Sequence, residues 1–446
     1  MIITRLRIRT LSAAGVVLLA TVALASCAAT ETDAASADTA SDLWDSSSVH
    51  SIEVSYDQED YDAMIETYLD SGEKEWIRAT VTIDGVTYED VGLKLKGNSS
   101  LRGLSTDADA ELSSENPEDL PWVIRLDEYV EDQNHEGTTE LVVRGNSSET
   151  ALNEAVALEL LEEAGLASEQ AIAVRFSADG SEETLRLVIE NPDDEWMERE
   201  LGDGLLYKAE AGGDYSYRGE DEEAYADVFD QEGGDDDLTP LIDFLQWLNE
   251  STDEEFAADL DEHLDVEAFA TYLAFQELVG NSDDIDGPGN NSYLYYDPDT
   301  GQMTVVSWDL NLAFGGGVGG GGMPDGGEGE APEGEAPEMG DGEMPEMPEG
   351  EAPEGEAPEG GDGEAGGGGF GGGGSNVLAE RFLENDEYAA LYEAELDRLQ
   401  EELYDSGTAT ELLDEWTQTL LDGASDLVDA ETIQEESDAI SAEIGG

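Results

Sequence analysis

Residues 315–375 consist almost entirely of Gly, Glu, Pro and Met, and the sequence GEAPEGEAPE occurs twice within them. Burial of apolar side chains is what offsets the entropy cost of ordering a backbone, and this segment has almost none to bury. We therefore expect residues 315–375 to be a disordered acidic insert. The residues after it, 376–446, read as amphipathic helices with too little apolar surface to fold alone. The chain must therefore build one fold from sequence on both sides of the insert.

The charge of the chain excludes one class of partner. The 446 residues include 111 acidic and 17 basic side chains, which gives a formal net charge of −94 at pH 7. Such a surface repels phosphate backbones, so we expect no nucleic-acid partner. The acid excess by itself is typical of a well-solvated extracellular or salt-adapted protein, and it names no function.

The N-terminus indicates where the protein resides. Three arginines in MIITRLRIRT precede the apolar run LSAAGVVLLATVALA, which ends close to Cys27, the only cysteine of the sequence. This order resembles a bacterial lipoprotein signal over residues 1–27, in which the cysteine becomes the lipidated first residue of the mature protein. We expect lipid on Cys27 to anchor the protein to the outer face of the cytoplasmic membrane. Residues 28–48, rich in Ala, Ser, Thr and Asp, would be a flexible tether.

Hydrophobic periodicity predicts an α+β fold. A strand followed by a helix is expected over 51–69, and a hairpin with an Asp-Gly turn over 79–100. Further strands and a second Asp-Gly hairpin flank one prominent helix at 149–165, which ends in glycine. The chain is mainly helical over 238–279, and another hairpin follows. The first half is thus expected to be an antiparallel sheet with one main helix.

Two turns share the pattern of a basic residue followed by Gly-Asn-Ser-Ser, at 96–100 and 144–148. Lysine is scarce, with four in the chain, yet Lys94 and Lys96 both lead into the first turn. They alternate onto one face of the predicted strand, toward backbone N–H groups and hydroxyls that can bind an anion. The first turn is therefore a candidate phosphate site, although Gly-Asn-Ser is also ordinary turn chemistry.

A second polar cluster lies between residues 280 and 315. Asp283 follows an apolar helix, Asn291 begins a predicted strand, and Asp309 follows the next strand. Phosphoryl transfer needs one carboxylate to accept the proton of the attacking hydroxyl, and an amide and a carboxylate to hold Mg²⁺ on the nucleotide. The order of these side chains therefore suggests a kinase-type site.

With these motifs the chain resembles the CotH kinase family of secreted atypical protein kinases, from about residue 50 to the C-terminus apart from the insert. The resemblance is carried by KGNSS, IRLDEY, LNEAVALELLEEAG, LLYK, GNSD, NNSYLYYD and SWDLNLAFG, in that order. It implies a two-lobed, protein-kinase-like α+β fold, with an antiparallel sheet in the N-lobe and a mostly helical C-lobe. It also implies ATP with Mg²⁺ or Mn²⁺ as cofactors, and phosphoryl transfer to Ser or Thr of extracytoplasmic proteins, with basic proteins as candidate substrates.

The resemblance also assigns residues to roles. Asp283 is implied as the catalytic base, and Asn291 and Asp309 as the metal ligands. The nucleotide-binding residues are implied to be Lys96, Asn98, Ser99, Ser100, Arg125 and Glu154. Lys96 and Arg125 would face the phosphates, and Glu154 would lie on the helix that positions such a cation. The second turn, 144–148, falls where the family has a variable turn, and we interpret it as a capping turn for the helix that follows.

Three positions depart from the family pattern. Leu120 stands where many relatives have lysine, Asn311 replaces a second acid, and the spacing to the metal-binding Asn makes Asp286 a competitor of Asp283 for the base role. These departures favour an alternative function, a catalytically inactive kinase-like lipoprotein that acts as an acidic binding or scaffold protein of the cell envelope. The retained Asp283 and Asp309 favour the kinase.

The expected organisation has six parts. They are the signal peptide at 1–27, the tether at 28–48, the N-lobe at 49–212, the C-lobe with the catalytic and metal motifs at 213–314, the insert at 315–375, and the C-terminal helices that complete the C-lobe at 376–446.

Overall fold

The computed structural model describes residues 43–97, 99–108, 110, 112–210, 213–285, 287, 290–315 and 376–445. The predicted signal peptide with Cys27, most of the predicted tether, and the predicted insert from residue 316 onward lie outside the described residues. Asn98 and Asp286 lie outside them as well. Within the described ranges, no helix is long and apolar enough to cross a membrane.

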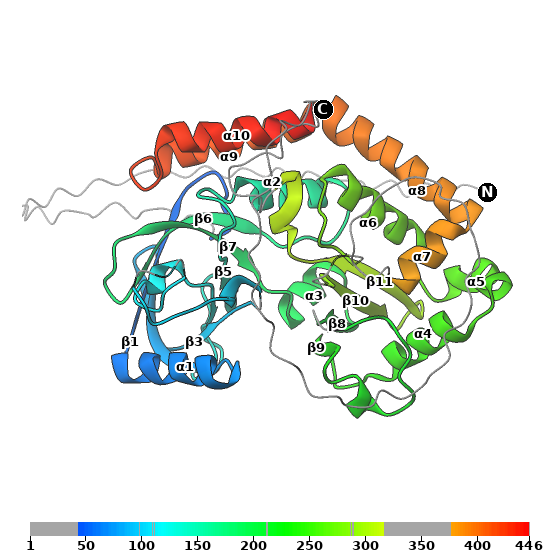
Figure 1. The fold of residues 1–446 in the computed structure, drawn as a ribbon, viewed down its shortest axis with the longest axis horizontal. Helices are drawn as coiled ribbons and strands as arrows, with labels where there is room; N and C mark the ends of the chain where they lie inside the picture. Colours follow the sequence, from blue (N-terminus) through cyan, green and yellow to red (C-terminus); the bar gives the residue numbers. More distant parts are fainter. Residues whose placement is uncertain are drawn as a thin grey trace, which may run out of the picture. The chain divides into compact units, whose positions relative to one another are not determined.

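The first half of the chain forms a closed seven-stranded barrel (Figure 1). Around the barrel the strands are β1 (His50–Tyr56), β2 (Ile77–Ile83), β3 (Val86–Leu95), β4 (Trp122–Arg125), β5 (Glu140–Val143), β7 (Thr184–Glu190) and β6 (Ala171–Ala178). Parallel pairing of β1 with β6, with Ile52 beside Phe176, closes the barrel. The predicted, mostly antiparallel pairing is confirmed by the other six pairs, but the prediction of an open sheet is corrected, because the parallel pair closes it into a barrel without edge strands.

The barrel core follows the alternation read from the sequence. Leu93 and Leu95 of β3 are fully buried inside the barrel, together with Trp122 of β4, so Lys94 between the two leucines points outward. Helix α1 (Gln58–Ser71) packs on the barrel through Met64. Both predicted Asp-Gly turns are confirmed, since 84–85 and 179–180 all have positive φ. The first forms a two-residue hairpin loop, and the second begins the longer loop between β6 and β7.

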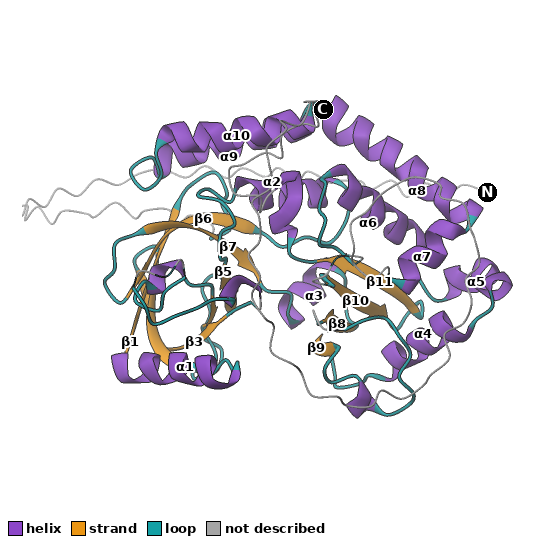
Figure 2. Ribbon diagram, viewed as in Figure 1, coloured by secondary structure: helices purple, strands orange, loops and turns teal. Residues whose placement is uncertain are grey.

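A second sheet follows the barrel in sequence (Figure 2). Its strand order is β11 (Gln302–Ser307), β10 (Ser292–Asp297), β8 (Leu205–Ala209) and β9 (Phe229–Gly233). Strand β8 falls within the stretch expected as the N-lobe but pairs with β10 and β9. The helices of this half before the insert are α4 (Thr239–Glu250), α5 (Asp253–Asp259) and α6 (Val266–Leu278), while the short α3 (Asp194–Glu200) links the barrel to β8.

The helices after the insert return to both halves of the fold. They are α7 (Val377–Glu384), α8 (Asp386–Leu399), α9 (Thr408–Gly423) and α10 (Ala430–Ile444). Helix α8 packs against α6, whereas α9 and α10 pack along α2 (Leu152–Glu163), the prominent helix predicted from the sequence (Figure 1). Leu160 of α2, Ala274 of α6, Trp416 of α9 and Ile440 of α10 belong to one buried cluster. The described residues on both sides of the insert therefore share a core.

Candidate functional site

The two basic turns lie side by side at one end of the barrel. Strands β3 and β5 both flank β4 and run in the same direction, so that Leu95 and Val143 are both paired with Trp122. Lys96 and Arg144 therefore leave the barrel on either side of the start of β4. A Cβ built on Gly145 would lie 3.5 Å from the Cβ of Ser100, so the second turn is in contact distance of the first.

Arg144, the cation of the second turn, lies between two carboxylates. Its Nε donates a hydrogen bond to Oε2 of Glu154 on α2 at 3.0 Å, while Nη2 forms an ion pair with Oε1 of Glu154 at 2.8 Å and also pairs with Asp309. The side chains of Arg144 and Glu154 are 11% and 3% exposed, and that of Asp309 is 23% exposed. Burial alone would lower the pKa of Arg144, but the charges of Asp309 and Glu154 raise it.

The partner of Glu154 therefore differs from the prediction. We expected Glu154 to position Lys96 or Arg125, and the expectation was wrong because β5, not β3 or β4, delivers its cation beside the first turn of α2. Arg125 on β4 pairs instead with Glu140, which lies opposite it on the adjacent strand β5. The interpretation of the second turn as a capping turn is incomplete rather than wrong, since the hydroxyl of Ser148 accepts a hydrogen bond from the N–H that precedes α2.

Lys96, the cation of the first turn, approaches the same place without a carboxylate partner in hydrogen-bond range among the described residues. Its Nζ donates to Oδ1 of Asn191 at 2.9 Å and lies 5.3 Å from the ring centroid of Trp308. The guanidinium carbon of Arg144 is 5.8 Å from the centroid of the same ring. The two turns thus bring two cations to the indole that directly precedes Asp309.

The four lysines of the sequence interact electrostatically. Burial, followed by the positive charge of Lys208, lowers the pKa of Lys96 to about 8. Burial also lowers the pKa of Lys74, with further contributions from the charges of Lys208 and Lys94. Each lysine therefore acts on, or is acted on by, at least one of the others.

Arg125 and Lys94 are two further cations on the outer face of the barrel. Lys94 on β3 and Arg125 on β4 both lie against Trp76, with their charged ends 4.2 and 5.2 Å from its ring centroid. The charge of Arg125 is already paired with Glu140 and lies 3.6 Å from Glu128. Lys94 and Lys96 are therefore better placed than Arg125 to bind an added anion.

Asn291 and Asp309 flank one end of the β10–β11 hairpin, and Asn291 contacts the backbone of Asp283. Ser292 pairs with Ser307, so Asn291 and Asp309 lie just beyond the same end of the ladder. Nδ2 of Asn291 donates to the carbonyl of Asp283 at 2.8 Å. Asp309 has a φ of 60°, an uncommon conformation that a non-glycine residue adopts mainly where the surroundings enforce it.

The chain passes very close behind Asp283. A Cβ on Gly287 would lie 2.4 Å from the Cα of Asp283 and 2.6 Å from its Oδ1. No side chain fits in that space, so glycine is required for the loop to fold back here. This close approach fixes the backbone of Asp283 next to Asn291.

Two oxygens are the candidate donors for a divalent cation. No group of three or more His, Cys, Asp or Glu that could hold a metal occurs in the described part of the chain. The candidates are the carboxylate of Asp309 and the amide oxygen of Asn291, whose nitrogen is used in the bond to Asp283. Mg²⁺ is commonly bound by one or two protein oxygens, with water and substrate phosphates as its other ligands.

A family model described as CotH kinase protein matches residues 93–437. The chain belongs to the CotH kinase family. No curated protein matches it.

The remaining residues that the sequence singled out in this CotH kinase family member have different surroundings. Ser100 lies exposed in the first turn, and the side chain of Ser99 is outside the description, as is Asn98. Leu120, which stands where many relatives have lysine, is fully buried in the barrel core. Asn311 contributes its backbone carbonyl, which accepts hydrogen bonds from Ser147 and Asn153 and ties the second turn and α2 to the segment after Asp309.

Sequence reasoning missed Arg144, Asn191, Lys74 and Lys208 as residues of this CotH kinase site. The scarcity of cations was the signal that could have found them, because in so acidic a chain a cation held in the interior needs a reason. The repeat of the basic Gly-Asn-Ser-Ser pattern was a second signal. It marked two strand ends that prove to be equivalent positions of one sheet.

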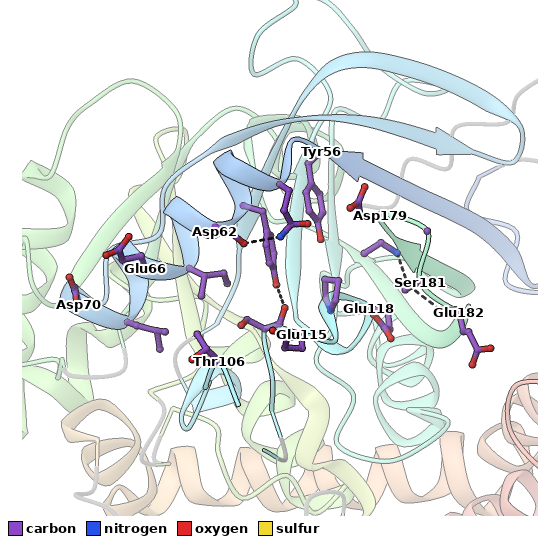
Figure 3. A pocket seen from close by; sticks show the side chains of 18 residues that line it. Tyr56, Asp62, Glu66, Asp70, Thr106, Glu115, Glu118, Asp179, Ser181 and Glu182 are labelled. Atoms are coloured by element: carbon purple, nitrogen blue, oxygen red, sulfur yellow. Dashed lines mark hydrogen bonds between the residues drawn. The ribbon is translucent and has the colours of Figure 1, made fainter. Parts of the chain in front are cut away.

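A separate cavity of about 810 Å³ lies beside α1 and is lined by none of the predicted site residues (Figure 3). Asp62, Glu66 and Glu118 are among the carboxylates around it, and Tyr56 stacks on Tyr61 at its wall with ring centroids 4.8 Å apart. Carboxylates line most surfaces of so acidic a chain. They do not by themselves make this cavity a site of the kinase family's chemistry.

Proposed function

We propose that the protein is a surface-tethered kinase that transfers a phosphoryl group from ATP, with Mg²⁺ or Mn²⁺, to Ser or Thr hydroxyls of extracytoplasmic proteins. One observation carries the proposal. Lys96 and Arg144, from two different turns, both lie against the ring of Trp308, which directly precedes Asp309, and Arg144 pairs with Asp309 itself. Membership of the CotH kinase family supports the same chemistry.

We further propose that the barrel acts as the N-lobe of a two-lobed kinase arrangement, and the second sheet with its helices as the C-lobe. The phosphate chain would lie along the outer wall of β3 and β5, where Lys96 and Arg144 supply donors. Such preorganised cations stabilise the charge that develops on a transferred phosphoryl group. The ring of Trp308 holds both cations next to Asp309.

Each remaining residue has a distinct task in this proposal. Asp309 and Asn291 would hold the divalent cation, which when bound neutralises charge on the phosphates. Asp283, tied to Asn291 through its backbone carbonyl, would accept the proton of the substrate hydroxyl. Asp286, the competitor for that role, lies outside the described residues.

Two variants test this division of roles, because one should lose nucleotide binding and the other should lose turnover. Asp309→Ala should abolish metal-dependent nucleotide binding, because it removes the carboxylate ligand of the site. Asp283→Ala should leave binding nearly intact and lower turnover by about 10²–10⁴-fold, the contribution of general base catalysis. Phosphotransfer to an envelope extract and calorimetric nucleotide binding would measure both. Equal binding losses in the two variants would contradict the assignment.

The alternative scaffold function has its own signature. A ligand at 100 times its dissociation constant stabilises a protein by about 2.7 kcal/mol. The absence of any thermal shift with ATP and either Mg²⁺ or Mn²⁺ would favour a catalytically inactive kinase-like binding protein over the enzyme.

We also propose that lipid on Cys27 anchors the protein at the outer face of the cytoplasmic membrane, where basic proteins would be attracted to its acidic surface. Cys27→Ser should then move the protein from the membrane fraction to the soluble fraction or block its processing. Fractionation and immunoblotting would measure the change, and unchanged attachment would refute the anchor.

A further inference from the structure

We propose that Arg144 is a positioning residue that withholds Asp309 from metal until phosphate arrives, so that metal and nucleotide bind as a unit. The inference rests on the proposed function and extends it to the order of binding. The guanidinium pairs with Asp309 and with Glu154 at the same time. The metal-binding carboxylate is therefore already engaged by a cation of this chain.

A metal ion and the Arg144 guanidinium compete for one carboxylate. The metal ion and the guanidinium are both positive. The side chains of Arg144 and Asp309 are largely buried, and like charges repel more strongly there than in water. A divalent cation at Asp309 therefore requires Nη2 of Arg144 to move off that carboxylate. The movement can be small, because Nε can keep its bond to Glu154 at 3.0 Å while the outer edge of the guanidinium turns away.

A metal ion without nucleotide brings no anion that could replace Asp309 as a partner of Arg144. Displacement from Asp309 would leave the guanidinium with one carboxylate in place of two, and the metal with only the oxygens of Asp309 and Asn291 from the predicted set. A nucleotide supplies both a new partner for Arg144 and further ligands for the metal. Its phosphate oxygens are acceptors of the kind that a planar guanidinium binds in a bidentate manner, and they complete the coordination of the metal.

Lys96 shows by contrast which cation is poised for the first encounter with phosphate. Its Nζ is held by the neutral amide of Asn191 and by the ring of Trp308, so an incoming phosphate breaks no ion pair there. Arg144, which follows β5 on the other side of β4, must exchange one anion for another. The geometry therefore assigns Lys96 to capture and Arg144 to the exchange that frees Asp309.

Binding of Mn²⁺ in the absence of nucleotide tests the inference. The full chain in detergent would be titrated with Mn²⁺ and followed by electron paramagnetic resonance, at high salt to screen the acidic surface. Removal of Arg144 alone would leave Glu154 buried without a partner, so the informative variant is Arg144→Met with Glu154→Gln, which removes both charges together. Glu154→Gln alone keeps the pair between Arg144 and Asp309 and is the matched control.

We expect the double variant to bind Mn²⁺ about ten- to hundredfold more tightly than wild type, the range expected from release of a charge-assisted hydrogen bond. Glu154→Gln alone should bind Mn²⁺ as weakly as wild type. Adding Asp309→Asn to the double variant should abolish the gain, which assigns it to this carboxylate. Equal Mn²⁺ affinities in wild type and the double variant would overturn the inference, as would a gain that survives Asp309→Asn.

The same titration separates this inference from the proposed function. Failure of wild type to bind ATP in the presence of Mn²⁺ would refute the kinase function, while the competition between Arg144 and Mn²⁺ would still be measured without nucleotide. If wild type binds ATP with Mn²⁺, the double variant should bind that complex more weakly despite its tighter hold on Mn²⁺. Tighter binding of the complex by the double variant would show that Arg144 does not serve phosphate.

Discussion

The two basic Gly-Asn-Ser-Ser turns have nearly the same sequence and equivalent places in the barrel, but they are used differently. Both follow strands that flank β4, and both carry a cation to the ring of Trp308. Lys96 meets an amide there, whereas Arg144 meets two carboxylates. The neighbours, rather than the turn motif, decide which cation is already paired with carboxylates and which is bound to a neutral amide.

The surroundings of each turn explain the difference. The second turn leads directly into α2, so its cation lies beside Glu154, and its hydroxyls and N–H groups are bound by Glu436 of α10. The first turn leads into a 3₁₀ segment at 99–101 and is held through the barrel, where the N–H of Lys96 donates to Pro121. The second turn is thus part of a buried network of carboxylates, whereas Lys96 of the first turn is bound by the amide of Asn191 and the carbonyl of Pro121.

The largest expected contrast is in stability. Arg144→Met should lower the free energy of unfolding by about 3–5 kcal/mol, because it leaves Glu154 and Asp309 buried or half-buried without their cation. Lys96→Met should change it by less than about 1 kcal/mol, because the lost ammonium is bound to a neutral amide and its burial is itself unfavourable. Urea unfolding of both variants measures the difference. Similar losses would mean that the two cations have the same role.

The next contrast is in pH dependence. Lys96 has a pKa lowered to about 8 by burial and by the charge of Lys208, so it is charged below that pH and neutral above it. Its contribution to nucleotide affinity should therefore be present at neutral pH and be lost as the pH rises through about 8, by roughly tenfold for one charge-assisted contact. Arg144 keeps its charge over this range.

Lys96→Arg is the control for the pH experiment, because a guanidinium does not titrate in this range. Calorimetric ATP titrations across pH 7 to about 9.5 should show the decline in wild type and a flatter profile in the variant. An identical decline in both would assign the titration to another group.

The smallest expected contrast concerns the serines of the two turns. Ser148→Ala removes a hydroxyl that donates to Glu436 at 2.8 Å and accepts from the N–H of Ala151 at 3.1 Å, so it should cost about 1 kcal/mol of stability. Ser100→Ala, at an exposed position of the first turn, should cost less than about 0.5 kcal/mol. Denaturant midpoints measure both changes. A larger loss at Ser100 would show that the first turn is as tightly embedded as the second.

Local patterns in the sequence determined much of the secondary structure. The two Asp-Gly turns, the apolar alternation of β3 and the glycine that ends α2 act over a few residues, and the structure confirms them. The ordered motifs also indicated the kinase family, which the match over 93–437 bears out. They placed Asn291 and Asp309 at one hairpin end, because both positions follow from the register of neighbouring strands.

The tertiary structure decided what no local pattern specifies. Closure of the barrel depends on a parallel pairing between β1 and β6, which are far apart in sequence. The gathering of Lys74 with Lys208, and the pairing of Arg144 with Asp309, likewise join groups on elements whose contact is set by packing. The physical reason is that periodicity and turn chemistry act through nearby backbone geometry, whereas the partner of a charge is whichever side chain the packed core brings within a few ångströms of it. The sequence by itself determined that two basic turns exist, and only the tertiary structure decided that the second one holds Asp309.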